Sequence, residues 1–141
     1  MIYLDSIDVE NRKVSLRIDV NLPFNEDGEC SNLTGLFRRL SPSLNYLRSK
    51  HSAIILLASH QSKMSLHGIC KKISEHFKVE IDFASTLDEA KEKCSKLQAG
   101  NIIMLENLAL LNDEQKCDKN FANKLVLYLI FMFLIHLTKQ T

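Results

Sequence analysis

Short apolar runs alternate with segments in which apolar residues recur every three or four positions along most of this 141-residue chain. Continuous apolar runs predict strands that are buried on both faces of a sheet. The three-to-four spacing predicts amphipathic helices. Together the patterns predict strands at 14–19, 53–58, 79–83 and 102–105, and helices at 36–50, 66–77, 86–97 and 118–127. Strands that alternate with helices favour a parallel sheet with right-handed crossovers, the α/β class.

Local signals mark both ends of the predicted helix 86–97. Thr86 is followed three residues later by Glu89, which is the pattern of a capping box. Gly100 comes shortly after the last apolar position, and glycine is favoured just beyond helix C-termini. We therefore expect this helix to begin at Thr86 and to be stopped by Gly100.

Polar side chains follow the first two predicted strands. Asp19 and Asn21 come at the end of the first strand, and His60 and Lys63 follow the second. In a parallel α/β sheet, ligands bind beyond the carboxyl ends of the strands. A carboxylate, an amide, an imidazole and an ammonium group suit a small, hydroxylated anion. Taken alone, the same residues more often form an Asx-type turn and a strand-end histidine without a ligand.

Composition limits the classes of function. Apolar residues make up 45% and charged residues 25%, which is the usual mix for one domain with a packed core. The net charge of +1 gives no electrostatic reason to expect a nucleic acid or an anionic membrane as partner. The four cysteines form no C-x-x-C pair and no secretory signal is seen, so we expect a cytoplasmic protein with idle thiols and no metal site.

Five segments, in order, resemble motifs of the phosphoglycerate kinase family. RIDVNLP at 17–23 resembles the family's RVDFNVP, and LLASH at 56–60 resembles the strand that leads into its SHLGRP loop. SL at 65–66, LENL at 105–108 and FANKL at 121–125 resemble the SL, LLENLRF and FAKKLA motifs. The resemblance implies a Rossmann-like, three-layer parallel sheet with helices on both faces, here incomplete. It implies a partial amino-terminal domain at 1–127, a divergent apolar tail at 128–141 and no nucleotide-binding domain.

The resemblance also implies a function. The family moves a phosphoryl group between 1,3-bisphosphoglycerate and ADP, giving 3-phosphoglycerate and ATP with magnesium. Asp19, Asn21, His60 and Lys63 match positions on the substrate side. No cofactor is expected in this chain, because the magnesium nucleotide binds the family's other domain and no Gly-rich phosphate loop with a lysine occurs here.

Three cationic positions of the family are changed. The arginine of its HLGR loop is Lys63, which cannot grip an anion in the bidentate way of a guanidinium. The arginine of a T-D-D-T-R-I-R-like segment falls on Gly35 or Leu36, and the one after LENL falls on Ala109. We therefore expect weak binding of a 3-phosphoglycerate-like molecule and no activity from the chain alone. A non-catalytic binding module and a non-functional truncated remnant are the alternatives.

Neighbouring arginines are not expected to replace the lost charge. Arg38 and Arg39 lie a few residues beyond Gly35 and Leu36, and helical geometry is expected to point them elsewhere.

The carboxyl-terminal tail is strongly apolar. The run at 125–135 is shorter than the roughly 20 residues that a membrane span needs. Three possibilities stay open: a buried strand or helix that completes the sheet, a poorly packed tail, and a membrane segment. We expect self-association through this tail, because apolar side chains left in water promote association.

Overall fold

The computed structural model describes residues 4–20, 26–27, 32–60, 64–114 and 133–136. In chain order, the elements are η1 (Leu4–Ser6), β1 (Lys13–Asp19), α1 (Thr34–Ser49), β2 (Ala53–Ser59), α2 (His67–Phe77), β3 (Asp82–Ala84), α3 (Leu87–Ser95), β4 (Ile102–Leu105), α4 (Leu108–Glu114) and β5 (Phe133–His136).

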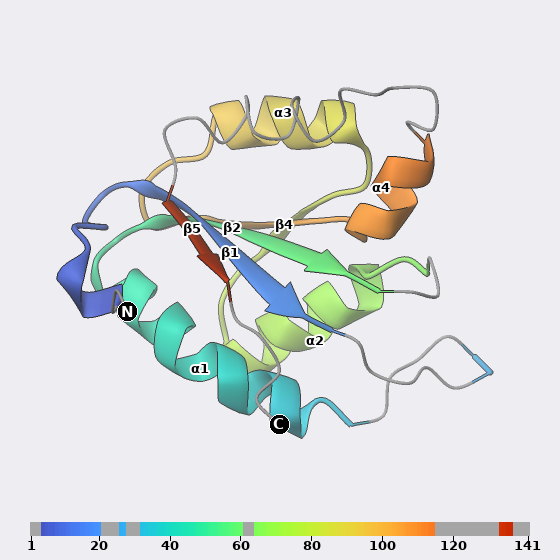
Figure 1. The fold of residues 1–141 in the computed structure, drawn as a ribbon, viewed down its shortest axis with the longest axis horizontal. Coiled ribbons are helices and arrows are strands. Elements are labelled where there is room, and N and C mark those ends of the chain that lie inside the picture. The colour runs from blue at the N-terminus through green and yellow to red at the C-terminus, as the bar shows by residue number, and fades with distance from the viewer. Residues whose placement is uncertain (1–3, 21–25, 28–31, 61–63, 115–132, 137–141) are drawn as a thin grey trace.

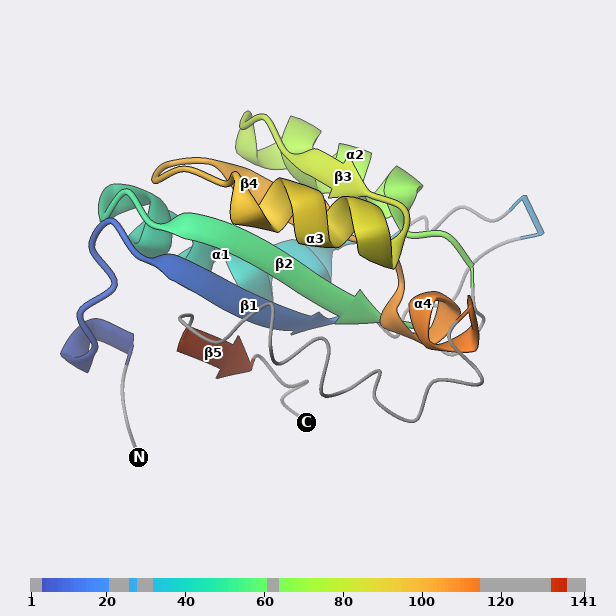
Figure 2. The ribbon, with the colours of Figure 1, turned by 90° about the horizontal axis from the view of Figure 1, so that it is seen from above.

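The described strands form one parallel sheet in the order β3-β4-β2-β1-β5. Helices α1 and α2 cover one face of this sheet, and α3 and α4 lie over the other (Figures 1 and 2). The predicted parallel α/β fold with three layers is therefore confirmed.

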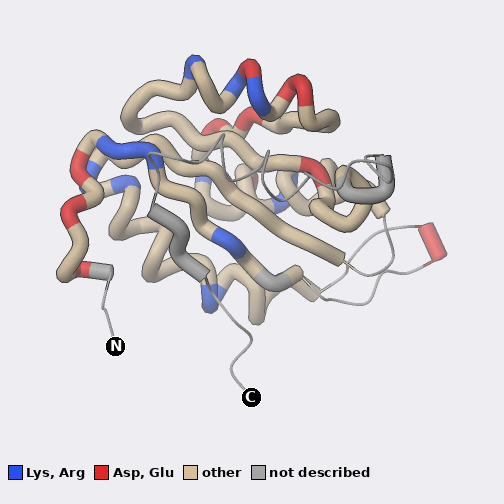
Figure 3. The backbone as a smooth tube through the Cα atoms, turned by 45° about the horizontal axis from the view of Figure 1, so that its top comes forward, with Lys and Arg blue, Asp and Glu red and all other residues tan. Residues whose placement is uncertain are grey.

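Alternation along the strands divides the apolar side chains between two cores. Ile54 and Leu56 of β2 belong to the larger core under α1 and α2, whereas Ile55 and Leu57 belong to the smaller core under α3 and α4. All four side chains are almost fully buried, which explains why this strand reads as a continuous apolar run. The charged residues lie mostly outside these cores, and both signs alternate along α3 (Figure 3).

The third strand is shorter than the sequence predicted. The pattern gave 79–83, but β3 spans only Asp82–Ala84. Helix α2 ends at Phe77, its C-cap residue Lys78 has the left-handed conformation, and Val79 is held to α2 by hydrogen bonds with Ser74. Val79 therefore belongs to the end of the helix, and pairing with β4 starts only at Asp82.

One helix prediction needs correction, and one helix was missed. Helix α3 ends at Ser95, so Gly100 does not stop it. Gly100 lies in the turn before β4, where its φ of +89° is in the left-handed region that favours glycine, and its N–H donates to the Ser52 carbonyl oxygen. The sequence also failed to predict α4, while the helix predicted at 118–127 falls outside the described residues.

Part of the apolar tail adds a strand to the sheet. Strand β5 pairs in parallel with β1, from Val14 opposite Phe133 to Arg17 opposite His136. Of the three possibilities for the tail, a strand in the sheet is the one that these four residues adopt. Within the described ranges, no helix is long and apolar enough to span a bilayer.

Candidate functional site

Strands β2 and β4 are neighbours whose chains leave toward opposite faces of the sheet. The segment after β2 leads to α2 on one face, and the segment after β4 leads to α4 on the other (Figure 1). In α/β sheets, ligands bind beyond the carboxyl ends of the strands at such a point of divergence. The candidate site is therefore the carboxyl ends of β2 and β4 and the adjoining end of β1.

A single buried amide joins the segments that follow β2 and β4. Asn107 Nδ2 donates to the carbonyl oxygens of His60, at 3.1 Å, and Met64, at 3.0 Å. Asn107 Oδ1 accepts from the backbone N–H groups of His60, at 2.9 Å, and Ala109, at 3.1 Å. Asn107 is fully buried, so its side chain fixes the start of the loop after β2 and also caps α4.

A buried carboxylate fixes the other end of the same loop. Glu106 is 4% exposed. Its Oε1 accepts from the N–H groups of Leu66 and Asn107, both at 2.7 Å, and its Oε2 accepts from Ser65 Oγ at 2.6 Å. Leu66 is the N-cap of α2 and has no side-chain acceptor of its own, so Glu106 supplies the negative group that a helix N-terminus favours.

The predicted site residues are only partly described. Asp19 pairs in register with Ser59, so β1 and β2 end at the same level, and His60 follows one residue beyond the end of β2. His60 is only 8% exposed, and both its backbone N–H and C=O are held by Asn107. Asn21, Lys63 and the side chain of Asp19 lie outside the described part of the chain, so their roles stay predictions.

The two positions on which the family's arginine falls, Gly35 and Leu36, differ in exposure. Leu36 is 1% exposed and belongs to the larger core, whereas Gly35 lies exposed in the first turn of α1. A Cβ atom on Gly35 would lie 3.6 Å from Arg39 Nη1. The expectation that Arg39 points elsewhere was therefore wrong. Helical side chains lean toward the N-terminus, so a residue reaches its neighbour four positions earlier.

A hollow of about 590 Å³ lies between the start of α2 and the strand β3, and Glu106 is among its lining residues. Its charged residues are Asp82, Glu89 and Glu106, and no lysine or arginine is among its lining residues. Three carboxylates would repel a phosphorylated acid. This hollow is therefore a poor candidate for the anion-binding site.

The described cysteines offer no nucleophile. Burial, and to a smaller extent the nearby Asp82 carboxylate, raises the pKa of the Cys70 thiol to about 11. Burial also raises the pKa of Cys94 to about 11, although Lys13 acts in the opposite direction. A thiolate is the reactive form of cysteine, so neither group suits covalent catalysis near neutral pH.

Comparisons with known proteins identify the family and agree with the fold. The family model described as phosphoglycerate kinase matches residues 4–131. A phosphoglycerate kinase from Prochlorococcus marinus (strain MIT 9312) is 33% identical over 132 residues, which are 86% of this chain and 32% of that relative. One from Helicobacter hepaticus is 30% identical, covering 84% of this chain and 31% of the relative. The chain thus spans about a third of the length of these curated relatives.

Solved structures show the same fold. The crystal structure of phosphoglycerate kinase from Pyrococcus horikoshii OT3 superposes with a TM-score of 0.81 at 22% identity, over 96% of this chain and 36% of that one. The enzyme from Coxiella burnetii gives a TM-score of 0.67 at 16% identity, over 87% and 32%. With a family match over residues 4–131 and this shared architecture, the chain belongs to the phosphoglycerate kinase family.

Proposed function

We propose that this chain forms the 3-phosphoglycerate side of a phosphoglycerate kinase and does not catalyse phosphoryl transfer by itself. The family match over residues 4–131 carries this proposal, because it aligns the chain with one part of its relatives. The family reaction transfers a phosphoryl group between 1,3-bisphosphoglycerate and ADP. A place in glycolysis and a cytoplasmic location follow from that reaction.

The proposed ligand is 3-phosphoglycerate or a similar small phosphorylated acid. Asp19 and Asn21 would bind its hydroxyl and carboxyl groups, and His60 would donate a hydrogen bond. Lys63 and Arg39 would supply positive charge, with Arg39 supported by its position beside Gly35. The magnesium nucleotide of the family reaction would bind outside this chain.

Loss of positioned charge supports the proposed inactivity. The family's arginine falls on an exposed glycine or on a leucine of the core. Removing one group that stabilises the charge of a transferring phosphoryl group commonly costs about 3–4 kcal/mol, on the order of a thousandfold in rate. Arg39 approaches Gly35 from the next turn of α1, so it would restore only part of this effect.

A coupled assay tests the proposed inactivity. The purified chain is mixed with ADP, magnesium and 1,3-bisphosphoglycerate, and ATP formation is compared with a protein-free blank. We expect the two rates to agree. Turnover above the blank that disappears in His60→Ala would show that the chain is an enzyme by itself.

A ligand titration tests the substrate side. Backbone NMR shifts of the chain are followed while 3-phosphoglycerate is added, and we expect binding in the millimolar range or weaker. Arg39→Ala should weaken this binding about threefold, since a surface charge interaction is modest. Arg38→Ala is the matched control, because Arg38 is the exposed neighbour on the same helix. Equal effects of the two substitutions would remove Arg39 from the proposed site, and micromolar binding would overturn the expected weakness.

A further inference from the structure

Strand β3 forms one edge of the sheet. Among the described residues, no strand pairs with its outer side. The Ala84 carbonyl accepts from the Glu106 N–H at 2.9 Å, so Ala84 faces β4. Because successive residues of a parallel strand direct their backbone groups to alternate sides, the N–H and C=O of Phe83 point outward. Outward groups of this kind are the template on which another strand can add.

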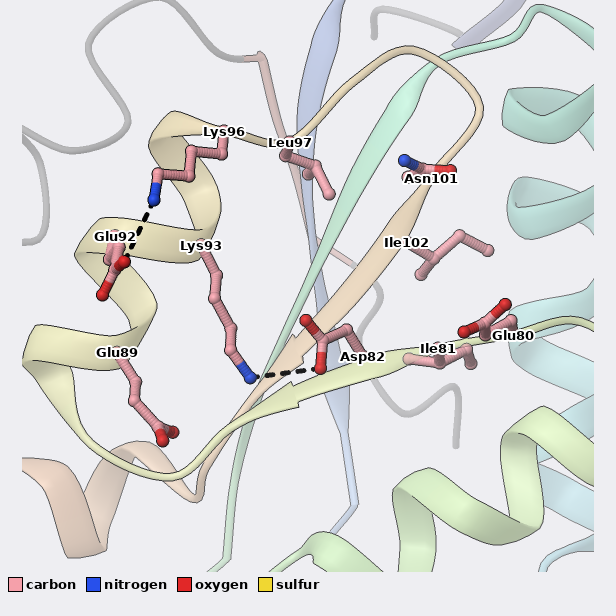
Figure 4. A pocket seen from close by; sticks show the side chains of 10 residues that line it. All are labelled: Glu80, Ile81, Asp82, Glu89, Glu92, Lys93, Lys96, Leu97, Asn101 and Ile102. Carbon is pink, nitrogen blue, oxygen red and sulfur yellow. Dashed lines mark hydrogen bonds and ion pairs between the residues drawn. The ribbon is translucent and has the colours of Figure 1, made fainter.

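Two side chains occupy both outward groups of Phe83. The Phe83 N–H donates to Asp82 Oδ1 at 2.8 Å, and Lys93 Nζ donates to the Phe83 carbonyl oxygen at 3.0 Å. Lys93 Nζ also lies 3.1 Å from Asp82 Oδ1. Figure 4 shows Lys93 reaching from α3 to Asp82 on β3, beside a hollow of about 640 Å³. The ion pair and the backbone of Phe83 thus form a closed ring along the edge.

The same helix also holds the residue after β3. The Ser85 N–H donates to Glu89 Oε2 at 2.8 Å, and Ser85 Oγ donates to the same oxygen at 2.9 Å. Two side chains of α3 therefore bind backbone groups of the edge: Lys93 binds the carbonyl of Phe83, and Glu89 binds the N–H of Ser85. Phe83 and Ser85 alternate with Ala84, which faces β4. In an ordinary edge strand, by contrast, the outward N–H and C=O groups are hydrogen-bonded by water.

We propose that Asp82 and Lys93 act together as a seal on β3 that prevents a second copy of this chain from adding its own β3 to the edge. The edge is self-complementary once it is opened. In an antiparallel pair centred on Phe83, the Phe83 residues of the two copies exchange two backbone hydrogen bonds. Asp82 then stands opposite Ala84 of the other copy, so no like charges oppose each other.

The experiment compares three variants of the full chain. Lys93→Met keeps a long side chain but removes the donor, and Asp82→Ala opens the ring from the strand side. Lys96→Met is the matched control, because Lys96 is the C-cap residue of the same helix and its ammonium group pairs with Glu92 Oε1 at 3.1 Å (Figure 4). Sedimentation over a concentration series measures association, and amide hydrogen exchange followed by NMR measures protection of the Phe83 N–H.

We expect Lys93→Met and Asp82→Ala to associate at least about tenfold more tightly than Lys96→Met and the unaltered chain. Protection of the Phe83 N–H should rise with concentration in these two variants only. All versions carry the same apolar tail, so association through the tail is common to all of them. If Lys93→Met does not fold, Asp82→Ala decides the question. Equal association in all versions, or association without protection at Phe83, would overturn the seal.

Discussion

Glu106 is a carboxylate held inside the protein by three donors from two segments of the chain. We predict that Glu106→Ala lowers the free energy of unfolding by about 3 kcal/mol, because buried donors left without an acceptor cost roughly 1–3 kcal/mol each. Urea denaturation measures the change. Glu92→Ala is the control, because the exposed Glu92 carboxylate forms a surface ion pair with Lys96. Loss of that pair should change stability by less than about 1 kcal/mol. A similar loss in both variants would contradict the structural role of Glu106.

Cys70 and Cys94 are predicted to resist alkylation in the folded protein. Both are buried, and burial raises the pKa of each thiol from 9.0 to about 11. Labelling with iodoacetamide at pH 8, with mass spectrometry of the two peptides, should be slow in buffer and fast in denaturant. Rapid labelling of either residue in buffer would contradict the burial.

The same thiols make stability depend on alkaline pH. A folded pKa above the unfolded value means that the contribution is fully present below pH 9 and is lost as the pH rises through about 11. The free energy of unfolding should therefore fall over this interval. Urea denaturation at several pH values measures the slope.

At the scale of the element, the start of α3 is a capping motif. Thr86 Oγ1 accepts from the Glu89 N–H at 3.1 Å, as the sequence predicted. We predict that Thr86→Ala costs about 1 kcal/mol of stability, the usual value for a lost N-cap. Thermal or urea denaturation measures it, with Ser95→Ala at the other end of α3 as a control that should cost less.

Glu89 adds a dependence on acid pH to this motif. Its pKa is lowered from 4.5, first by the backbone hydrogen bond from Ser85, then by the Ser85 hydroxyl and by the charge of Lys93. Because the folded pKa is lowered, the contribution is present above pH 4.5 and is lost as the pH falls through the folded value. Glu89→Gln should therefore show a flatter fall of stability in acid than the unaltered chain.

Long elements with one apolar stripe or run were predictable, and short elements held by distant contacts were not. Helix α1 was found because Leu36, Leu40, Leu44 and Leu47 mark its buried face. Helix α4 was missed because Asn107 caps it from within the LENL match, where no long periodic pattern follows. The shortening of β3 depends on how α2 ends, which a pattern of alternating residues does not reveal.

In the candidate site, the positions at the strand ends were predictable, whereas the contacts between distant segments were not. The common end of β1 and β2, at Asp19 and Ser59, followed from a parallel sheet. The links that Glu106 and Asn107 make to the loop after β2 did not follow, because those partners lie about 40 residues or more earlier in the chain. A signal was available, since a carboxylate and an amide directly after a buried strand are expected to find partners. The position of Arg39 required the spacing of four residues on a helix to be taken into account.

At the scale of the molecule, the tail remains a candidate for self-association, although 133–136 form β5. A version that ends at Leu127 removes β5 and leaves one side of β1 without its partner. We predict that this version unfolds at lower urea concentration than the full chain, because the hydrogen bonds between β1 and β5 are lost. Sedimentation of both versions at matched concentration measures association. A full chain that stays monomeric would show that the tail does not drive association.

The position of β1 between β2 and β5 has a consequence for the time course of folding. Its partner on one side, β2, follows after a single helix, whereas its partner on the other side lies more than a hundred residues along the chain. Closing a long loop costs more entropy, and distant contacts form late. During synthesis, β1 can pair with β2 early, but its other side must wait until residues 133–136 have left the ribosome. Until then, β1 has a partner on only one of its two sides, although it later lies in the interior of the sheet.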